Sequence, residues 1–124
     1  MNREILFLAK RLDNGEWVEG DLLHTRHADV VLISDFKDQL FRCDGNTICQ
    51  YTGLTDKNGN KIWENDILRN KKGDIGVVQW FEEHAAFMIW NKTKHYVCYL
   101  AENDFSKIEI AGNEFDNADL LEVE

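Results

Sequence analysis

Short apolar runs separated by turn-forming clusters are the feature that most constrains the fold of this chain. Runs of aromatic and β-branched residues recur about every 8 to 12 residues, and clusters of Gly, Asn and Asp separate them. Apart from an ambiguous segment at 34–43 and the C-terminal end, no long window keeps a helical period, and the chain has no proline. The pattern predicts a mainly β protein with little helix, a sandwich or a small barrel.

Turn signals place the expected strands along the chain. Asn14-Gly15 is a strong hairpin signal, and Asp44 to Asn46 predicts a further turn. A short helical turn is expected near the C-terminus, with Asn117 as its cap. The expected strands are 4–9, 17–24, 29–34, 38–43, 74–81, 85–90, 95–100 and 107–112.

Size and charge bound the function. A chain of 124 residues forms one domain, or two very small ones sharing a core. Its 23 acidic and 14 basic residues give a net charge of −9, which repels phosphate and disfavours nonspecific nucleic-acid binding. No apolar run approaches the ~20 residues that cross a bilayer, and the N-terminus lacks the long apolar core of a signal peptide. We expect a cytoplasmic protein whose three cysteines, Cys43, Cys49 and Cys98, are reduced thiols.

Two segments of the chain resemble each other. In each, an Asn-Gly turn leads to Trp, then Glu, Asp and two aliphatic residues, provided that Val18 is looped out. A duplication would create two similar β-hairpin units that pack together, and chance similarity is the alternative. The matching positions are Trp17, Glu19, Asp21, Leu22 and Leu23 in the first copy, and Trp63, Glu64, Asp66, Ile67 and Leu68 in the second.

Metal sites and catalysis find little support in the residue patterns. The segment from Asp56 to Asn60, DKNGN, resembles the start of a calcium loop, but Lys61 stands where the required Gly would be. We expect a hairpin turn there instead, with Asn58-Gly59 in a type I′ conformation. The cysteines and histidines lack zinc spacing, and no nucleophile or phosphate-loop signature occurs. We expect no cofactor, no metal and no catalytic residue.

Two groups of side chains are candidates for binding. Aromatic residues on either side of one expected hairpin would fill the core, or form a contact surface for a partner. That candidate contact surface is Trp80, Phe81, Trp90 and Tyr96. The candidate basic patch, which could face phosphate, is Arg69, Lys71 and Lys72.

The stretch from Ile48 to Leu68 resembles the signature of the YopX family of small phage and prophage proteins. Three segments outside this stretch are also similar to the family: "REILF", "GEWVEGDL" and "IEIAGNEFDNADLL" resemble its opening, Trp-Val and closing segments. The chain departs from the family pattern at three positions: Trp63 stands where Tyr or Phe is usual, Asn65 where Gly is usual, and Ala111 where Ile is common. Asn tolerates positive φ, so the backbone at Asn65 is expected to be unchanged. The signature residues, expected to be structural, are Gln50, Tyr51, Thr52, Gly53, Leu54, Asp56, Asn58, Gly59, Glu64, Asp66 and Ile67.

The resemblance implies an architecture and an origin rather than a reaction. It implies an SH3-like antiparallel barrel at 49–124, preceded by a β unit at 1–48, together forming one compact domain. It also implies a phage or prophage accessory protein in a bacterial host, without established activity. We expect it to be non-enzymatic and to act by self-association or by binding a phage or host protein. The alternatives are a nucleic-acid-associated SH3-like module and, less favoured, a small hydrolase.

Overall fold

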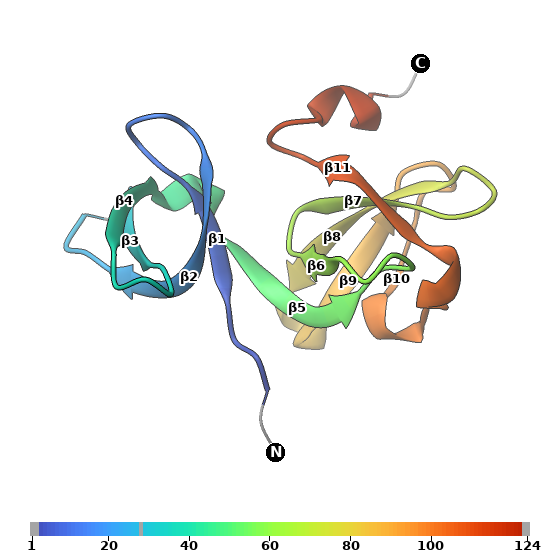
Figure 1. The fold of residues 1–124 in the computed structure, drawn as a ribbon. Coiled ribbons are helices and arrows are strands. Elements are labelled where there is room, and N and C mark those ends of the chain that lie inside the picture. Colours follow the sequence, from blue (N-terminus) through green and yellow to red (C-terminus); the bar gives the residue numbers. More distant parts are fainter. Residues whose placement is uncertain (1–2, 28, 123–124) are drawn as a thin grey trace. The chain divides into compact units, whose positions relative to one another are not determined.

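The computed structural model describes residues 3–27 and 29–122 and confirms a mainly β chain (Figure 1). The chain divides into two compact units, Met1–Tyr51 and Thr52–Glu124. The boundary falls inside strand β5 (Cys49–Thr55).

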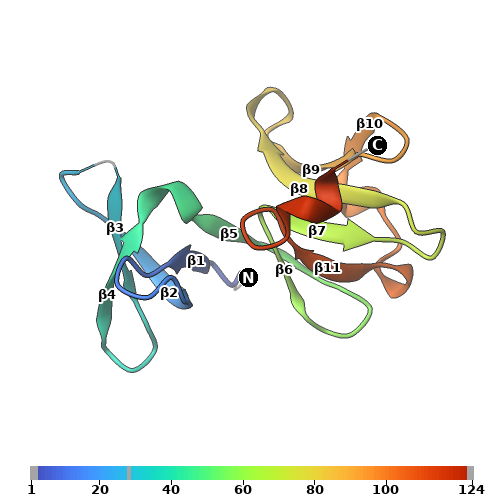
Figure 2. The same ribbon diagram turned by 90° about the horizontal axis from the view of Figure 1, so that it is seen from above.

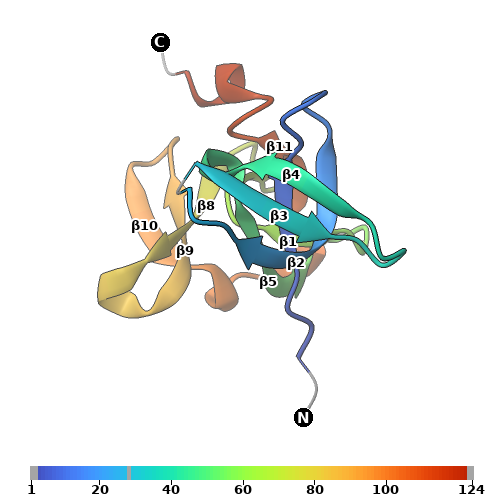
Figure 3. The same ribbon diagram turned by 90° about the vertical axis from the view of Figure 1, so that its left-hand side faces the viewer.

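Unit 1 is an antiparallel sheet of short strands in the order β4-β3-β2-β1-β5 (Figure 3). Alternation in β3 places Val31 and Ile33 in the core, where they meet Ala9, Val18 and Cys43. An isolated bridge from Arg11 to Cys43 joins the end of β1 to β4, so the sheet curves strongly. The elements are β1 (Phe7–Lys10), β2 (Trp17–His24), β3 (Val30–Ser34), β4 (Leu40–Asp44), the 3₁₀ turn η1 (Gly45–Thr47) and the start of β5.

Unit 2 holds a five-stranded antiparallel sheet in the order β10-β9-β8-β7-β11 (Figure 2). Strand β6 lies beside the end of β5, and short 3₁₀ turns connect the later strands. The elements are β6 (Lys61–Trp63), β7 (Asp66–Arg69), β8 (Ile75–Phe81), η2 (Glu82–His84), β9 (Ala86–Asn91), β10 (Tyr96–Tyr99), η3 (Leu100–Glu102), η4 (Phe105–Lys107), β11 (Glu109–Asn113) and η5 (Ala118–Leu121).

One face of this sheet carries the core of unit 2. In register across the strands, Val78 pairs with Ile89 and Ile89 with Cys98, so these three side chains share a face. Their buried companions come from β6, β7, η3 and the residue before β11: Ile62, Leu68, Leu100 and Ile108. The core therefore joins elements from almost the whole length of unit 2.

The expected barrel closure is not found. Within the described residues the sheet of unit 2 ends at β10 on one side and at β11 on the other. The two similar segments also differ in conformation. Gly20 lies within the continuous strand β2, whereas Asn65, its counterpart, has a φ of +73° in the turn between β6 and β7. The SH3-like barrel and the duplication therefore stay predictions.

The C-terminal turn forms, but its cap works differently from the expectation. Asn117 occupies the N-cap position of η5, and its side chain makes no capping bond to that turn. Its Oδ1 instead accepts a hydrogen bond of 3.1 Å from the Asn113 backbone N–H. The expected cap is wrong because the N–H of Asn113, the last residue of β11, takes the same acceptor.

Candidate functional site

The turn at the centre of the family-like signature is built around the Asp56 side chain. Its Oδ1 accepts hydrogen bonds from the backbone N–H groups of Asn58 and Asn60, each at 2.9 Å. Asp56 and Asn60 also close the hairpin through Asp56 N–H to Asn60 O, at 2.9 Å. Gly59 has a φ of +81°, whereas Asn58 has no positive φ. The type I′ prediction is therefore wrong: this is a three-residue loop with glycine alone in the left-handed region.

The same turn occurs three times within residues 3–27 and 29–122. Asp35 accepts from the N–H groups two and four positions later, and the Asn70 Oδ1 accepts likewise from Lys72 and Asp74. The fourth residue of each turn is left-handed: Asp38, Gly59 and Gly73 have φ values of 63°, 81° and 84°. The DKNGN segment is thus one example of a hairpin turn that recurs in this chain. Its Asp56 carboxylate accepts hydrogen bonds from backbone N–H groups.

Replacing Gly59 with Ala is expected to lower the free energy of unfolding by about 1–2 kcal/mol, because Ala is strained at positive φ. No atom lies within 4 Å of the added methyl, so the cost is one of backbone conformation alone. Urea unfolding would measure it. The opposite substitution at the equivalent position, Asp38→Gly, should leave stability unchanged or raise it; a comparable loss in both variants would contradict this account.

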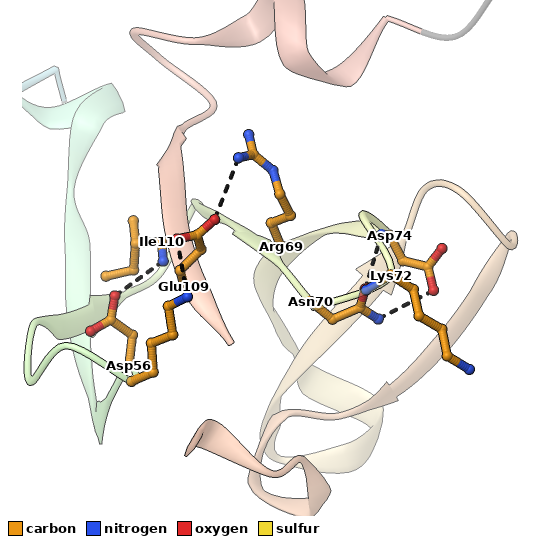
Figure 4. Close-up of polar contacts among 8 residues, drawn as sticks. Asp56, Arg69, Asn70, Lys72, Asp74, Glu109 and Ile110 are labelled. Atoms are coloured by element: carbon orange, nitrogen blue, oxygen red, sulfur yellow. Dashed lines mark hydrogen bonds and ion pairs between the residues drawn. The ribbon is translucent and has the colours of Figure 1, made fainter. Parts of the chain in front are cut away.

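Asp56 differs from its two counterparts in a contact to a distant strand. Its Oδ2 accepts a 3.1 Å hydrogen bond from the backbone N–H of Ile110 in β11 (Figure 4). In addition, Lys57 N–H donates to Ile108 O at 2.9 Å. Asp56 is 6% exposed. Burial opposes its ionisation, but the backbone donors of Asn60, Ile110 and Asn58 outweigh burial and hold the pKa of this carboxyl below its ordinary value. An ionised carboxylate therefore fastens β11 to the turn.

The signature residues that precede the Asp56 turn lie in strand β5 and contact its neighbours. Gln50 pairs with Phe7, and Tyr51 N–H donates to Leu6 O at 2.9 Å. In unit 2 the Thr52 hydroxyl donates to Ile62 O at 2.7 Å, Gly53 has a φ of +89°, and Leu54 packs against the core.

The downstream part of the signature is a second tight turn. Asn65 takes positive φ, as the substitution for Gly predicts, and Asp66 Oδ2 accepts the Trp63 N–H at 2.8 Å. Neighbouring strands hold this turn: Asn65 N–H donates to Val78 O at 2.7 Å, and Glu114 N–H donates to Asn65 O at 3.0 Å. Burial raises the pKa of Asp66 to about 7, and the nearby Asp56 adds to the rise. In the same region, burial raises the pKa of Glu114 above its ordinary value, and the negative charge of Glu64 raises it further.

Part of the candidate basic patch lines a surface hollow beside the Asp56 turn. Arg69 and Lys71 face it together with Lys57 and Lys107, two cations that the sequence interpretation missed. Lys72 does not line it and in Figure 4 lies on the Asp74 side of the Asn70 turn. The hollow measures about 280 Å³. Its lining residues, which define the basic hollow, are Lys57, Arg69, Asn70, Lys71, Gly73, Lys107 and Glu109.

The candidate contact surface is divided between two faces of the unit 2 sheet. Strand alternation puts Phe81 and Trp90 on one face and Trp80 on the other. Trp80 packs edge-on against Phe87, with ring centroids 5.1 Å apart, yet stays 47% exposed. Tyr96, also 47% exposed, pairs with Asn91 on the edge strand β10. These four residues therefore do not form one continuous surface.

The thiols and the metal-binding residue types are placed as follows. Cys43 and Cys49 are buried and Cys98 is partly buried, and burial raises the pKa of the Cys43 thiol. Across residues 3–27 and 29–122, no three His, Cys, Asp or Glu side chains gather as a metal site would require. The same part of the chain contains no helix of the length and apolarity needed to span a membrane.

Comparison with known proteins identifies the family. No curated protein matches the chain. The sequence pattern of the family described as "YopX protein" matches residues 6–122, which include every signature residue discussed above. Because this match covers nearly the whole chain, the protein belongs to the YopX family.

Proposed function

We propose that this chain is a non-enzymatic accessory protein, encoded by a phage or prophage, that acts in the host cytoplasm by protein binding. The favoured partner is a second copy of the chain, and a phage or host protein is the other partner considered. Family membership supports the origin. A binding role is supported by the signature carboxylates Asp56 and Asp66, which accept hydrogen bonds from backbone N–H groups and so hold the fold.

The observation that carries the proposal is the apolar edge of the unit 2 sheet. Strand β10 ends the sheet, so one side of its backbone has no neighbouring strand in the described pairing. Tyr96, Val97 and Tyr99 are 47%, 38% and 39% exposed, although edge strands of monomeric proteins usually carry charges. Such an edge is a template for another strand.

Ring contacts stabilise the face beside this edge. Tyr99 Oη lies 3.3 Å from His84 Nδ1, and the two rings meet edge-on with centroids 5.6 Å apart. Phe81 also stacks with His84, with ring centroids 6.3 Å apart. The edge strand and this aromatic row would together supply backbone pairing and apolar burial to a partner.

For the architecture of unit 2, we propose an open relative of the SH3-like barrel expected for the family. Support comes from its succession of short antiparallel strands, β7, β8, β9 and β10, joined by tight turns.

Light scattering during size-exclusion chromatography would test the proposal over micromolar to submillimolar concentrations. The wild type is expected to form a dimer, and Val97→Lys to dissociate it at least tenfold more readily, because a charge on the edge opposes strand pairing. Leu40→Lys is the matched control: Leu40 is 59% exposed on β4, the edge strand of the other sheet. It should leave the dimer intact.

A monomer at every concentration would exclude self-association. Pull-down from infected cells with the wild type and Val97→Lys would then test the other partner class. Equal recovery of a partner by both variants would exclude the β10 edge as the binding surface.

A further inference from the structure

We infer that the basic hollow binds a compact anion of the phosphate class, such as pyrophosphate or a terminal diphosphate of a larger molecule. This site is separate from the β10 edge and independent of the proposed function. Its cations come from four places in the chain: Lys57 in the Asp56 turn, Arg69 at the end of β7, Lys71 in the Asn70 turn and Lys107 in η4. Only the tertiary fold brings them to one hollow.

The ion pairs of the hollow leave positive charge uncompensated. Glu109 is shared: Oε2 lies 3.5 Å from Lys57 Nζ and Oε1 lies 3.5 Å from Arg69 Nη1. Both distances exceed the ~2.7–2.9 Å of a strong charge-assisted bond. Lys107 pairs with Asp104 at 3.7 Å, and both side chains are 60% exposed. Lys71 makes no ion pair within the described residues. Four cations thus meet two carboxylates, an excess of two positive charges.

The scaffold holds these cations near their positions before any ligand arrives. Lys57 N–H donates to Ile108 O at 2.9 Å, one link of the contact that joins the Asp56 turn to β11. Lys71 lies in the Asn70 turn. The Asn70 side chain fixes this turn by accepting hydrogen bonds from Lys72 N–H and Asp74 N–H, each at 3.0 Å. Figure 4 shows Glu109 between the Asp56–Ile110 contact and Arg69. Pre-positioned donors reduce the ordering cost of binding a small ligand.

Charge and size favour a compact anion over an extended nucleic acid. The whole chain carries −9, so a hollow with an excess of +2 leaves −11 elsewhere. A strand of nucleic acid extending beyond the hollow by more than the ~8–10 Å screening length would meet that acidic surface. A diphosphate-sized group concentrates its charge within the about 280 Å³ available.

The test is a titration of the ¹⁵N-labelled full chain with sodium pyrophosphate at fixed ionic strength, followed by NMR. Saturable shifts are expected at the amides of Lys57 and Lys71. Lys71→Gln should weaken binding about fivefold to tenfold, because it removes a charge close to the ligand. Lys72→Gln removes the same charge from the same turn outside the hollow, and should weaken binding less than twofold.

Further ligands identify the phosphate source. Inorganic phosphate should bind more weakly than pyrophosphate, and a nucleoside 5′-diphosphate that binds more tightly would indicate a terminal diphosphate as the natural ligand. The inference is overturned if pyrophosphate produces no saturable shifts, or if Lys71→Gln and Lys72→Gln weaken binding equally. Tighter, strongly salt-dependent binding of a single-stranded oligonucleotide would also overturn it.

Discussion

Replacing Asp56 with Asn is expected to lower the free energy of unfolding of unit 2 by about 2–4 kcal/mol. The amide oxygen can still accept from the N–H groups of Asn58 and Asn60, as the Asn70 side chain does in its own turn. The amide nitrogen cannot accept from Ile110, and that N–H loses its charged acceptor in a buried place. The substitution therefore removes the link to β11 while keeping the hairpin.

Urea unfolding followed by tryptophan fluorescence would measure this effect. Three of the four tryptophans, Trp63, Trp80 and Trp90, lie in unit 2, so the signal reports mainly on that unit. The control is Asp35→Asn, which changes the same turn position where only the two local N–H groups are accepted. It should change stability by less than ~0.5 kcal/mol. Equal losses in both variants would show that the hairpin, and not the contact to β11, depends on the carboxylate.

The strands were predictable from the sequence because their signals are local. Alternation and flanking turns place β2 at Trp17–His24, as expected, and β3 and β8 to within a residue. The positive φ of Asn65 was predictable for the same reason, since it follows from the residue type at a position where the family has Gly.

The organisation of the site was not predictable because its partners are far apart in sequence. The local sequence around Asp56 is that of an ordinary Asx turn. What distinguishes Asp56 is the hydrogen bond that its second oxygen accepts from Ile110, 54 residues later in the chain. Likewise, Lys57 and Lys107 join Arg69 only because β11 pairs with β7, through Glu109 and Arg69, and nothing in either local segment signals that pairing. The cap at Asn117 failed for a local reason instead, since the N–H of Asn113, at the end of β11, donates to the same side-chain oxygen.

Asp66 makes the stability of unit 2 depend on pH in the direction opposite to Asp56. Its pKa is raised from 3.8 to about 7, so the folded state holds a proton that the unfolded state releases between those values. Stability should therefore fall as pH rises through this window, by about 2 kcal/mol between pH 5 and pH 7, and level off above pH 8. Asp56, whose pKa is lowered, stabilises the fold above its ordinary pKa and loses that effect only as pH falls through its lower, folded value.

Asp66→Asn should remove this fall in the stability of unit 2 with rising pH. Asn can accept the Trp63 N–H without carrying a charge, so the variant should match the wild type near pH 4 and exceed its stability by about 3–4 kcal/mol at pH 8. Urea unfolding of both proteins at each pH would measure the difference, in which the four histidines common to both cancel. Asp21→Asn, at the corresponding exposed position of the similar segment, should give a pH-independent difference below ~0.5 kcal/mol. A constant difference between Asp66→Asn and the wild type across this range would mean that Asp66 is already ionised in the folded protein, and its buried position would then need a counter-charge to explain it.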